Sequence, residues 1–361
     1  MKILYGVQGT GNGHISRANA ISRILAKHPD VEVTWLLSGR EANNLFEVEG
    51  SRIFRRGLTF ASNQGSISYA KTVVQNNLCT LGKDVLQLDL NPFDCLITDY
   101  EPVLSWAAKL RGRNTIGIGH QYAFNHQIPL AGDNFLNRAL LKHFAPADLG
   151  LGLHWHHFGQ PILPPICDVS TKNEVLHIDH KVVVYLPFED QDMVLRALAP
   201  LTHWEFFVYS PELQNRDMGH IKTRALSREG FKCDLHSANA VIANTGFELI
   251  SECLSLGIKV LTKPVAKQME QISNAKALDL LGYARVVEQL ETAVCRDWLE
   301  HGTGITITYP DVHQHIGEWL INGQTESIEA LSARLWKSVQ VYREKRNGTE
   351  VPLSTQLTLA C

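Results

Sequence analysis

Closely spaced glycines that end in a histidine are the first residues of this chain whose types and spacing could do chemistry. Residues 8–14 read Q-G-T-G-N-G-H and follow a short apolar run. Glycines let backbone N–H groups approach a ligand, and a helix N-terminus favours negative charge. The loop at Gly11 and Gly13 is therefore either a phosphate or diphosphate site or a tight turn without a ligand. Histidine is a common general base at neutral pH, so His14 is a candidate for that role, unless it only caps or packs against the helix.

The glycine spacing does not meet the G-x-G-x-x-G pattern of dinucleotide sites. The second predicted strand ends at Ser38-Gly39-Arg40, without the acidic residue expected to hold an NAD ribose. Ser38 and Arg40 would still suit the 2′-phosphate of NADP. An NADP-dependent oxidoreductase therefore stays open as an alternative.

Two carboxylates follow a predicted strand at 93–98. Asp99 is a second candidate base, and Glu101 would position an acceptor unless it only caps the next helix. His120 and Gln121 end the following strand at the same edge of the predicted sheet. We expect them to contact an acceptor.

A second polar group follows a predicted strand at 240–243. Thr245 is a good N-cap for the helix that begins there, and Gly246 would let a ligand approach the exposed amides. Glu248 and Glu252 are four residues apart and share one helix face, which either faces solvent or offers a carboxylate to the two hydroxyls of a ribose. Past the next strand, Gln268 and Gln271 could read sugar hydroxyls.

The elements that must position these residues alternate between strand and helix, which predicts parallel sheets covered by helices on both faces. Three prolines within 161–165 break the alternation, and it then restarts. We therefore expect an N-terminal domain over 1–163, a C-terminal domain over 164–340 and a tail over 341–361. The predicted strands are 2–7, 32–37, 93–98, 114–118, 181–186, 204–209, 240–243 and 259–262, and the predicted helices include 15–27 and 249–256.

Composition bounds the class of protein. The 361 residues carry a formal net charge of −3, which argues against a nucleic-acid binder, although the first 165 residues are slightly basic. Seven cysteines without a C-x-x-C pair predict a reduced protein without a zinc ribbon. We find no run long enough to span a membrane and no signal peptide, so we expect a cytoplasmic protein.

Two segments have a second interpretation. Residues 154–157 read H-W-H-H, but no carboxylate or cysteine stands at a supporting spacing, so we favour packing over metal binding. The stretch 135–144 pairs apolar residues with basic flanks, which fits either a core-facing helix or peripheral contact with a membrane.

The order of these motifs resembles MurG-type glycosyltransferases. Residues 245–252 read T-G-x-x-x-x-x-E, Gly257 follows, and after a strand comes E-Q-x-x-N-A at 270–275. The first glycine loop and the G-Q-P run at 159–161 resemble further landmarks of that family. The chain departs from it at 186–190, where L-P-F-E-D stands in place of a glycine-rich loop, and at 15–17, which read I-S-R.

This resemblance implies an α/β protein of the GT-B fold, with two Rossmann-like doubly wound domains that face each other across a cleft. It implies that Glu252 binds the ribose of a uridine nucleotide. It also implies that Gly11, Gly13 and His14 lie across the cleft, near the diphosphate and the attacking hydroxyl. The remaining donor residues would line the diphosphate and base, namely Thr245, Gly246 and Phe247, and face the donor sugar, namely Gln268, Glu270 and Gln271.

We therefore expect a hexosyltransferase that moves a sugar from a UDP-sugar to a hydroxyl with inversion, and without a metal or another cofactor. The acceptor is an unknown glycan, lipid or small molecule, and the protein would work in the cytoplasm, including at the inner face of the membrane. The alternatives are a nucleotide-sugar epimerase of the same fold, an NADP-dependent oxidoreductase and a non-catalytic nucleotide-sugar-binding protein.

Overall fold

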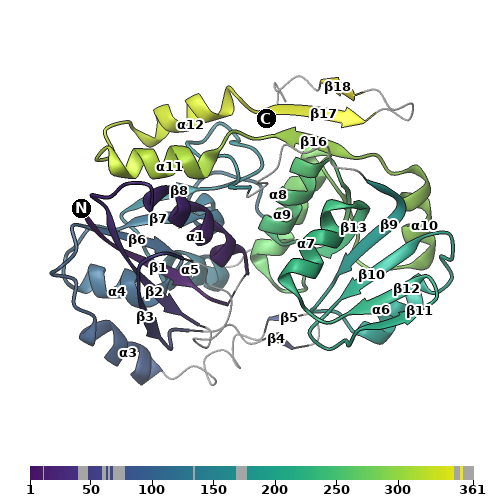
Figure 1. Ribbon diagram of the computed structural model, residues 1–361, viewed down its shortest axis with the longest axis horizontal. Helices are drawn as coiled ribbons and strands as arrows, with labels where there is room; N and C mark the ends of the chain where they lie inside the picture. The colour runs from purple at the N-terminus through teal and green to yellow at the C-terminus, as the bar shows by residue number, and fades with distance from the viewer. Residues whose placement is uncertain are drawn as a thin grey trace.

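A computed structural model describes residues 1–10, 12–39, 48–58, 62–63, 66–67, 78–132, 135–167, 177–344 and 350–352. Two α/β halves lie side by side, each built on its own sheet (Figure 1). The expected alternation of strand and helix is therefore confirmed.

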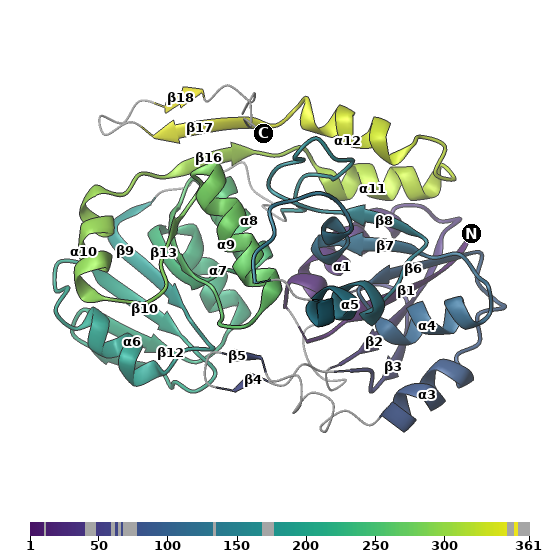
Figure 2. The ribbon, with the colours of Figure 1, turned by 180° about the vertical axis from the view of Figure 1, so that it is seen from behind.

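The N-terminal half holds a parallel sheet in the order β3-β2-β1-β6-β7-β8. The core side chains of β1 alternate between two faces, with Ile3 and Tyr5 packed on the side of the first helix and Leu4 packed on the other. Helices therefore cover both faces, and Figure 2 shows α4 on the side turned away in Figure 1. The elements are β1 (Lys2–Gln8), α1 (Asn12–Leu25), β2 (Glu32–Ser38), β3 (Ser51–Arg55), α3 (Leu78–Gln87), β6 (Cys95–Asp99), α4 (Pro102–Leu110), β7 (Ile116–Gly119), the 3-10 helix η1 (His120–Asn125), α5 (Phe135–Phe144) and β8 (Leu149–Gly152).

The C-terminal half holds a sheet in the order β11-β12-β10-β9-β13-β14-β15, parallel except where β11 meets β12. Its helix α8 ends at Gly257, which has a left-handed φ of 72° that suits glycine. The elements are β9 (Ile178–Tyr185), α6 (Gln191–Leu198), β10 (Glu205–Tyr209), β11 (Arg216–Met218), β12 (Ile221–Arg224), α7 (Arg228–His236), β13 (Ala238–Asn244), α8 (Phe247–Leu256), β14 (Lys259–Lys263), α9 (Met269–Leu281), β15 (Arg285–Val286) and α10 (Thr292–His301).

The end of the chain differs from the expected division. Helices α11 (Val312–Ile321) and α12 (Ile328–Trp336) cross back and lie over the N-terminal half (Figure 1). Trp336 donates from its indole nitrogen to the carbonyl of Ile162 at 2.6 Å. The residues expected to begin a tail instead enter a small antiparallel sheet of β16 (Ile305–Thr308), β17 (Gln340–Glu344) and β18 (Glu350–Pro352). Burial of Val339 and Val341 at the start of β17 favours this small sheet. The remaining strands, β4 (Ser62–Asn63) and β5 (Ser66–Ile67), pair with each other.

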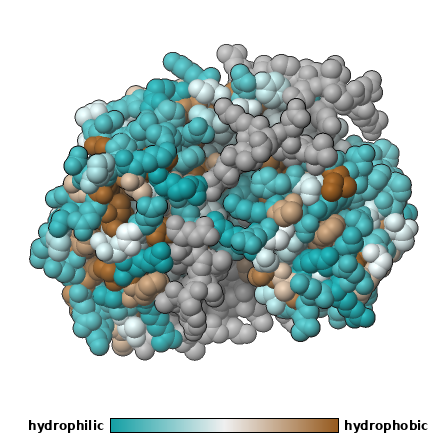
Figure 3. All heavy atoms as spheres, in the orientation of Figure 1, coloured by the Kyte–Doolittle hydropathy of each residue, from teal (hydrophilic) through white to brown (hydrophobic). Residues whose placement is uncertain are grey.

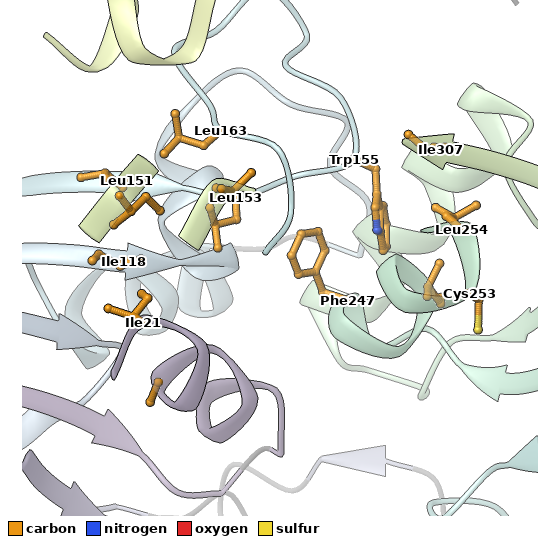
Figure 4. Close-up of a cluster of buried hydrophobic side chains, with 14 of the residues drawn as sticks. Ile21, Ile118, Leu151, Leu153, Trp155, Leu163, Phe247, Cys253, Leu254 and Ile307 are labelled. Carbon is orange, nitrogen blue, oxygen red and sulfur yellow. The ribbon is translucent and has the colours of Figure 1, made fainter. Parts of the chain in front are cut away.

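A hydrophobic cluster joins the two halves. Figure 4 shows Leu151 and Leu153 from the N-terminal sheet on one side, and Cys253 and Leu254 from α8 on the other. Trp155 and Phe247 lie with them in the same buried cluster, and the centroids of their rings are 5.0 Å apart. The two sheets are therefore held together by packed side chains as well as by the connecting chain.

The exterior is mostly hydrophilic on the face shown in Figure 3, with scattered hydrophobic residues. Among the described residues, no helix is both long and apolar enough to cross a membrane. Within α5, the partly buried Leu140 and Leu141 pack against Tyr100 and Tyr122, which agrees with the core-facing interpretation of that helix. Membrane contact stays a prediction.

Candidate functional site

The site begins where the N-terminal sheet reverses its strand order, between β1 and β6. Ligands of open parallel sheets bind outside the carboxyl ends of the strands at such a reversal. His14 lies in the first turn of α1, which follows β1, and Asp99 is the last residue of β6. Their side chains meet, with Nδ1 of His14 2.6 Å from Oδ1 of Asp99.

Asp99 is fully buried and is held by a third residue, Arg17. Nε of Arg17 donates to Oδ2 at 2.8 Å, and Nη2 donates to Oδ1 at 2.6 Å. Burial opposes ionisation, but the charges of Arg17 and His14 outweigh it and hold the pKa of Asp99 below its usual value. Asp99 is thus an ionised acceptor, which requires that Nδ1 of His14 carries a proton.

This arrangement distinguishes the two candidate bases. The side chain of Asp99 is 0% exposed and that of His14 is 11% exposed. Within the part of the chain that the structure describes, Nε2 of His14 has no hydrogen-bond partner. The geometry therefore favours His14 as the group that meets a substrate and Asp99 as the group that orients it.

Glu248 reaches this cluster from the C-terminal half. It lies in the first turn of α8, and its Oε1 accepts a hydrogen bond from Nη1 of Arg17. A methyl group at Gly13 would overlap the Glu248 carboxylate, so glycine lets this side chain lie directly over the start of α1. Gly13 therefore faces a carboxylate, whereas the resemblance implied a diphosphate. The prediction for Gly11 concerns a residue outside the described ones.

His120 forms a second junction between the halves. Its Nδ1 lies 2.8 Å from the carbonyl of Leu153, and its Nε2 lies 2.7 Å from Oδ1 of Asn274 on α9. Its ring stacks on Phe247, with centroids 4.0 Å apart and planes 3° apart. Because both ring nitrogens are engaged and the ring is buried, the structure differs from the acceptor contact expected for His120. The buried Phe247 likewise packs beneath this ring and does not line an open site.

Gln121 and Glu270 face each other across the same boundary. Nε2 of Gln121 lies 3.3 Å from Oε2 of Glu270, which is in the first turn of α9. The sequence placed Gln121 on the acceptor side and Glu270 on the donor-sugar side. The structure thus brings one residue of each expected group into contact.

Glu101 caps a helix. Its Oε1 accepts from the backbone N–H of Val103 at 2.9 Å, and its Oε2 accepts from that of Leu104 at 2.7 Å. Ser38 donates its hydroxyl to Oε1 at 2.6 Å. Burial raises the pKa of Glu101 to about 7 despite these bonds. Of the two interpretations left open, the geometry favours capping over acceptor positioning, because both oxygens are buried and engaged.

Buried side chains organise the strand ends of the C-terminal half. Gln271 accepts at Oε1 from the backbone N–H groups of Thr245 and Val265, both at 3.0 Å. It therefore ties the loop after β13 to the loop after β14, and its carbonyl oxygen is not free for a donor sugar. The hydroxyl of Thr245 turns inward to Thr262 at 2.9 Å. Gly246, not Thr245, is the N-cap of α8, and no side chain caps this helix.

The other donor-side residues lie on the same helices and loops of the C-terminal half. Gly246 has open space where a Cβ would stand. Gln268 is the N-cap residue of α9 and is partly buried. Glu252 lies one turn after Glu248 on α8 and is also partly buried. In the divergent loop after β9, Glu189 accepts from Nζ of Lys263 at 2.8 Å.

The H-W-H-H segment is packed. The backbone N–H of Trp155 donates to Nδ1 of His154 at 2.9 Å, and that of Phe158 donates to Nδ1 of His156 at 3.0 Å. Burial lowers the pKa of His156 to about 4. Among the described residues, no three His, Cys, Asp or Glu side chains gather as a metal site would require.

The sequence was compared with models of known protein families. The sequence profile of glycosyl transferase family 1 matches residues 1–301. The chain belongs to this family.

Several solved structures share the fold of this chain. The glycosyltransferase of kitacinnamycin is 12% identical to this chain, with a TM-score of 0.59. The match covers 93% of this chain and 98% of the kitacinnamycin enzyme's chain. CalG4, the calicheamicin glycosyltransferase, is 16% identical with a TM-score of 0.54, covering 83% and 89%. SnogD from Streptomyces nogalater is 14% identical with a TM-score of 0.53, covering 93% and 99%. No curated protein sequence matches the chain.

The fold of this family 1 protein is thus the GT-B fold of two Rossmann-like domains, as expected. The narrower resemblance to MurG-type enzymes stays a prediction. Ser38, which would have suited an NADP phosphate, is buried and engaged with Glu101.

Sequence reasoning missed three residues of this site. Arg17 was noted only as a departure from the resembling family, although a spacing of three residues places it on the same helix face as His14. Asn274, within the E-Q-x-x-N-A motif, links His120 to the carbonyl of Thr245, to which its Nδ2 donates at 3.2 Å. Glu248 was weighed beside Glu252, but nothing local indicated its partner.

Proposed function

We propose that this protein transfers a sugar from a nucleotide sugar to an acceptor hydroxyl, with inversion at the anomeric carbon. The observation that carries the proposal is the contact of His14 with the buried, ionised Asp99 at the strand-order reversal. That contact leaves Nε2 as the acceptor of a proton. Family membership supports the same reaction class.

The chemistry follows from these two residues. The acceptor oxygen attacks the anomeric carbon from the face opposite the diphosphate, and its proton passes to Nε2 of His14. The bond between the anomeric carbon and the diphosphate breaks, and its electron pair leaves with the diphosphate. Asp99 stabilises the imidazolium that forms. The uncapped N-terminus of α8 at Gly246 would stabilise the departing charge, and we propose no metal or other cofactor.

For the donor we propose a UDP-sugar, with the ribose bound by Glu252. The structure of SsfS6 from Streptomyces sp. SF2575 in complex with thymidine diphosphate, 13% identical, supports a pyrimidine nucleoside diphosphate. For the acceptor, the rhamnosyltransferase SpnG in complex with spinosyn aglycone supports a hydroxyl-bearing aglycone. A glycan or a lipid remains a further acceptor class within the proposal.

Ligand binding tests the donor. UDP should raise the melting temperature of the protein, and NADP should not, because a ligand that binds only the folded state stabilises it. Glu252→Ala should weaken UDP binding by roughly 10- to 150-fold, which corresponds to about 1.5–3 kcal/mol for hydrogen bonds to a charged group. Glu229→Ala, an exposed acid in the first turn of α7, is the control.

Stabilisation by NADP alone would overturn the proposed function, and equal UDP affinity in Glu252→Ala would remove this residue from the site. Product analysis with UDP-sugars and hydroxyl acceptors separates the alternatives. Transfer gives a glycoside, whereas an epimerase gives a second nucleotide sugar and a non-catalytic binding protein gives neither.

A further inference from the structure

Arg17 joins the two halves of the protein next to His14. Its side chain is 2% exposed and lies one turn after His14 on α1. Two of its nitrogens hold the oxygens of Asp99, and the third, Nη1, donates to Glu248 on α8. One buried cation is thus shared between a carboxylate of the N-terminal half and a carboxylate of the C-terminal half.

The charges of this cluster balance only when His14 takes a second proton, at Nε2, and becomes a cation. Arg17 and Asp99 cancel each other, and Glu248 adds a negative charge. Partial burial opposes ionisation of Glu248, but Arg17, followed by His14 and His120, holds its pKa below the usual value. Because Asp99 and Arg17 are shielded from water, an excess negative charge here is weakly screened. A second proton on His14, at Nε2, removes that excess.

We propose that Glu248 is a positioning residue for proton transfer, which acts through Arg17 and makes His14 an effective base only when the two halves are closed. With Glu248 withdrawn, the guanidinium of Arg17, whose Nη2 lies 3.0 Å from Nδ1 of His14, would oppose a positive charge on the ring. With Glu248 present, Arg17 is neutralised from both sides. The acceptor proton can then move to Nε2 as the new glycosidic bond forms and the diphosphate leaves with its electron pair. This inference rests on the proposed function.

The groups that face His14 and Glu248 come from several elements. Asp99 from β6 and Arg17 from α1 contact His14, and the ring of Tyr100 lies parallel to it, with centroids 6.4 Å apart. His120 from η1 acts on Glu248 through its charge. Tyr5 from β1, fully buried, acts on Asp99 and Arg17, and burial keeps its pKa well above the usual value. Of these groups, Glu248 is therefore the one that the C-terminal half supplies.

A competing explanation follows from the place of the Glu248 carboxylate over Gly13. A diphosphate cannot occupy the same volume, so Glu248 could act as a plug that a donor must displace. The two explanations predict opposite effects of removing the charge. A plug that is weakened should improve donor binding, whereas a lost positioning residue should slow the chemical step.

Glu248→Gln tests the inference because it keeps the shape and removes the charge. We expect kcat to fall by up to about 10-fold, with little change in the KM for the donor. The acidic limb of the kcat–pH profile should move to lower pH by about one unit, since a nearby negative charge favours the protonated ring. Glu248→Asp, which restores the charge at shorter reach, should return the acidic limb toward wild type.

Asp192→Asn is the matched control, because Asp192 is an exposed acid in the first turn of α6 in the same half. It should leave kcat and the pH profile unchanged. A Glu248→Gln variant with wild-type kcat and pH profile would overturn the inference while transfer still depends on His14. Tighter donor binding with faster turnover would also overturn it, in favour of a plug. Failure of the proposed function would look different, since the wild type itself would then form no glycoside.

Discussion

The two halves of this protein meet at two junctions of different chemistry. At one, the guanidinium of Arg17 bridges Asp99 and Glu248. At the other, His120 stacks on Phe247 and bonds to Asn274. The aromatic junction is buried, whereas Glu248 at the ionic junction is 32% exposed.

This difference indicates that the two junctions serve different purposes, one in stability and the other in turnover. An aromatic stack and its surrounding apolar contacts gain most from exclusion of water and change little with pH. A partly exposed ionic contact is directional and responds to charge, so it suits a place where a proton moves. We expect the aromatic junction to determine stability and the ionic junction to determine turnover.

The largest effect should come from His14 at the ionic junction. His14→Ala should lower turnover by about 10²–10⁴-fold, the usual range for a positioned general base, and leave UDP affinity nearly unchanged. Steady-state kinetics and calorimetry measure the two quantities. His143→Ala, an exposed histidine in the last turn of α5, is the control. Wild-type turnover in His14→Ala would assign the base to another residue.

The aromatic junction should dominate stability. Phe247→Ala removes a buried ring from the stack and should lower the free energy of unfolding by about 3–5 kcal/mol. Urea denaturation measures this loss. Phe54→Ala, at an exposed phenylalanine of β3, should cost much less. Equal losses in the two variants would show that the junction carries no special share of the stability.

The hydroxyl of Ser251 gives a second test of how the buried contacts between the halves contribute to stability. Ser251 on α8 accepts from the indole nitrogen of Trp155 at 2.8 Å, so Ser251→Ala leaves a buried donor unpaired. The free energy of unfolding should fall by about 1–3 kcal/mol. Ser255→Ala is the matched control one turn later, because in the described part of the chain the Ser255 hydroxyl is buried without a partner. If Ser255→Ala costs as much, the bond to Trp155 is not the cause.

The smallest effect should be the contribution of Glu248 to stability. Its pKa is lowered in the folded protein, so its contribution is present above the usual value near 4.5 and is lost as pH falls through the folded value. Wild type should exceed Glu248→Gln by about 1 kcal/mol at pH 7, a low figure because the side chain is partly exposed. The gap should narrow in urea titrations as the pH falls below the usual value of 4.5. A gap that is constant with pH would exclude the ionic contact as its source.

Much of the fold was determined by the sequence alone, because the signals are local. Alternating apolar strands and helices predicted both sheets, and the glycine at 257 marked the end of α8. His14 and Asp99 were both recognised as candidates, because each follows or ends a strand. The carboxyl ends of neighbouring parallel strands share one edge, so local patterns were enough to place them near each other.

Only the tertiary structure decided what these residues contact. Arg17 and Glu248 are 231 positions apart, and their pairing depends on how two domains close. Asp99 and Glu101 are two residues apart and chemically alike, yet one binds a guanidinium and the other caps a helix with two backbone N–H groups. Periodicity and capping patterns arise from neighbours along the chain, whereas charge partners and burial depend on segments that meet only after folding.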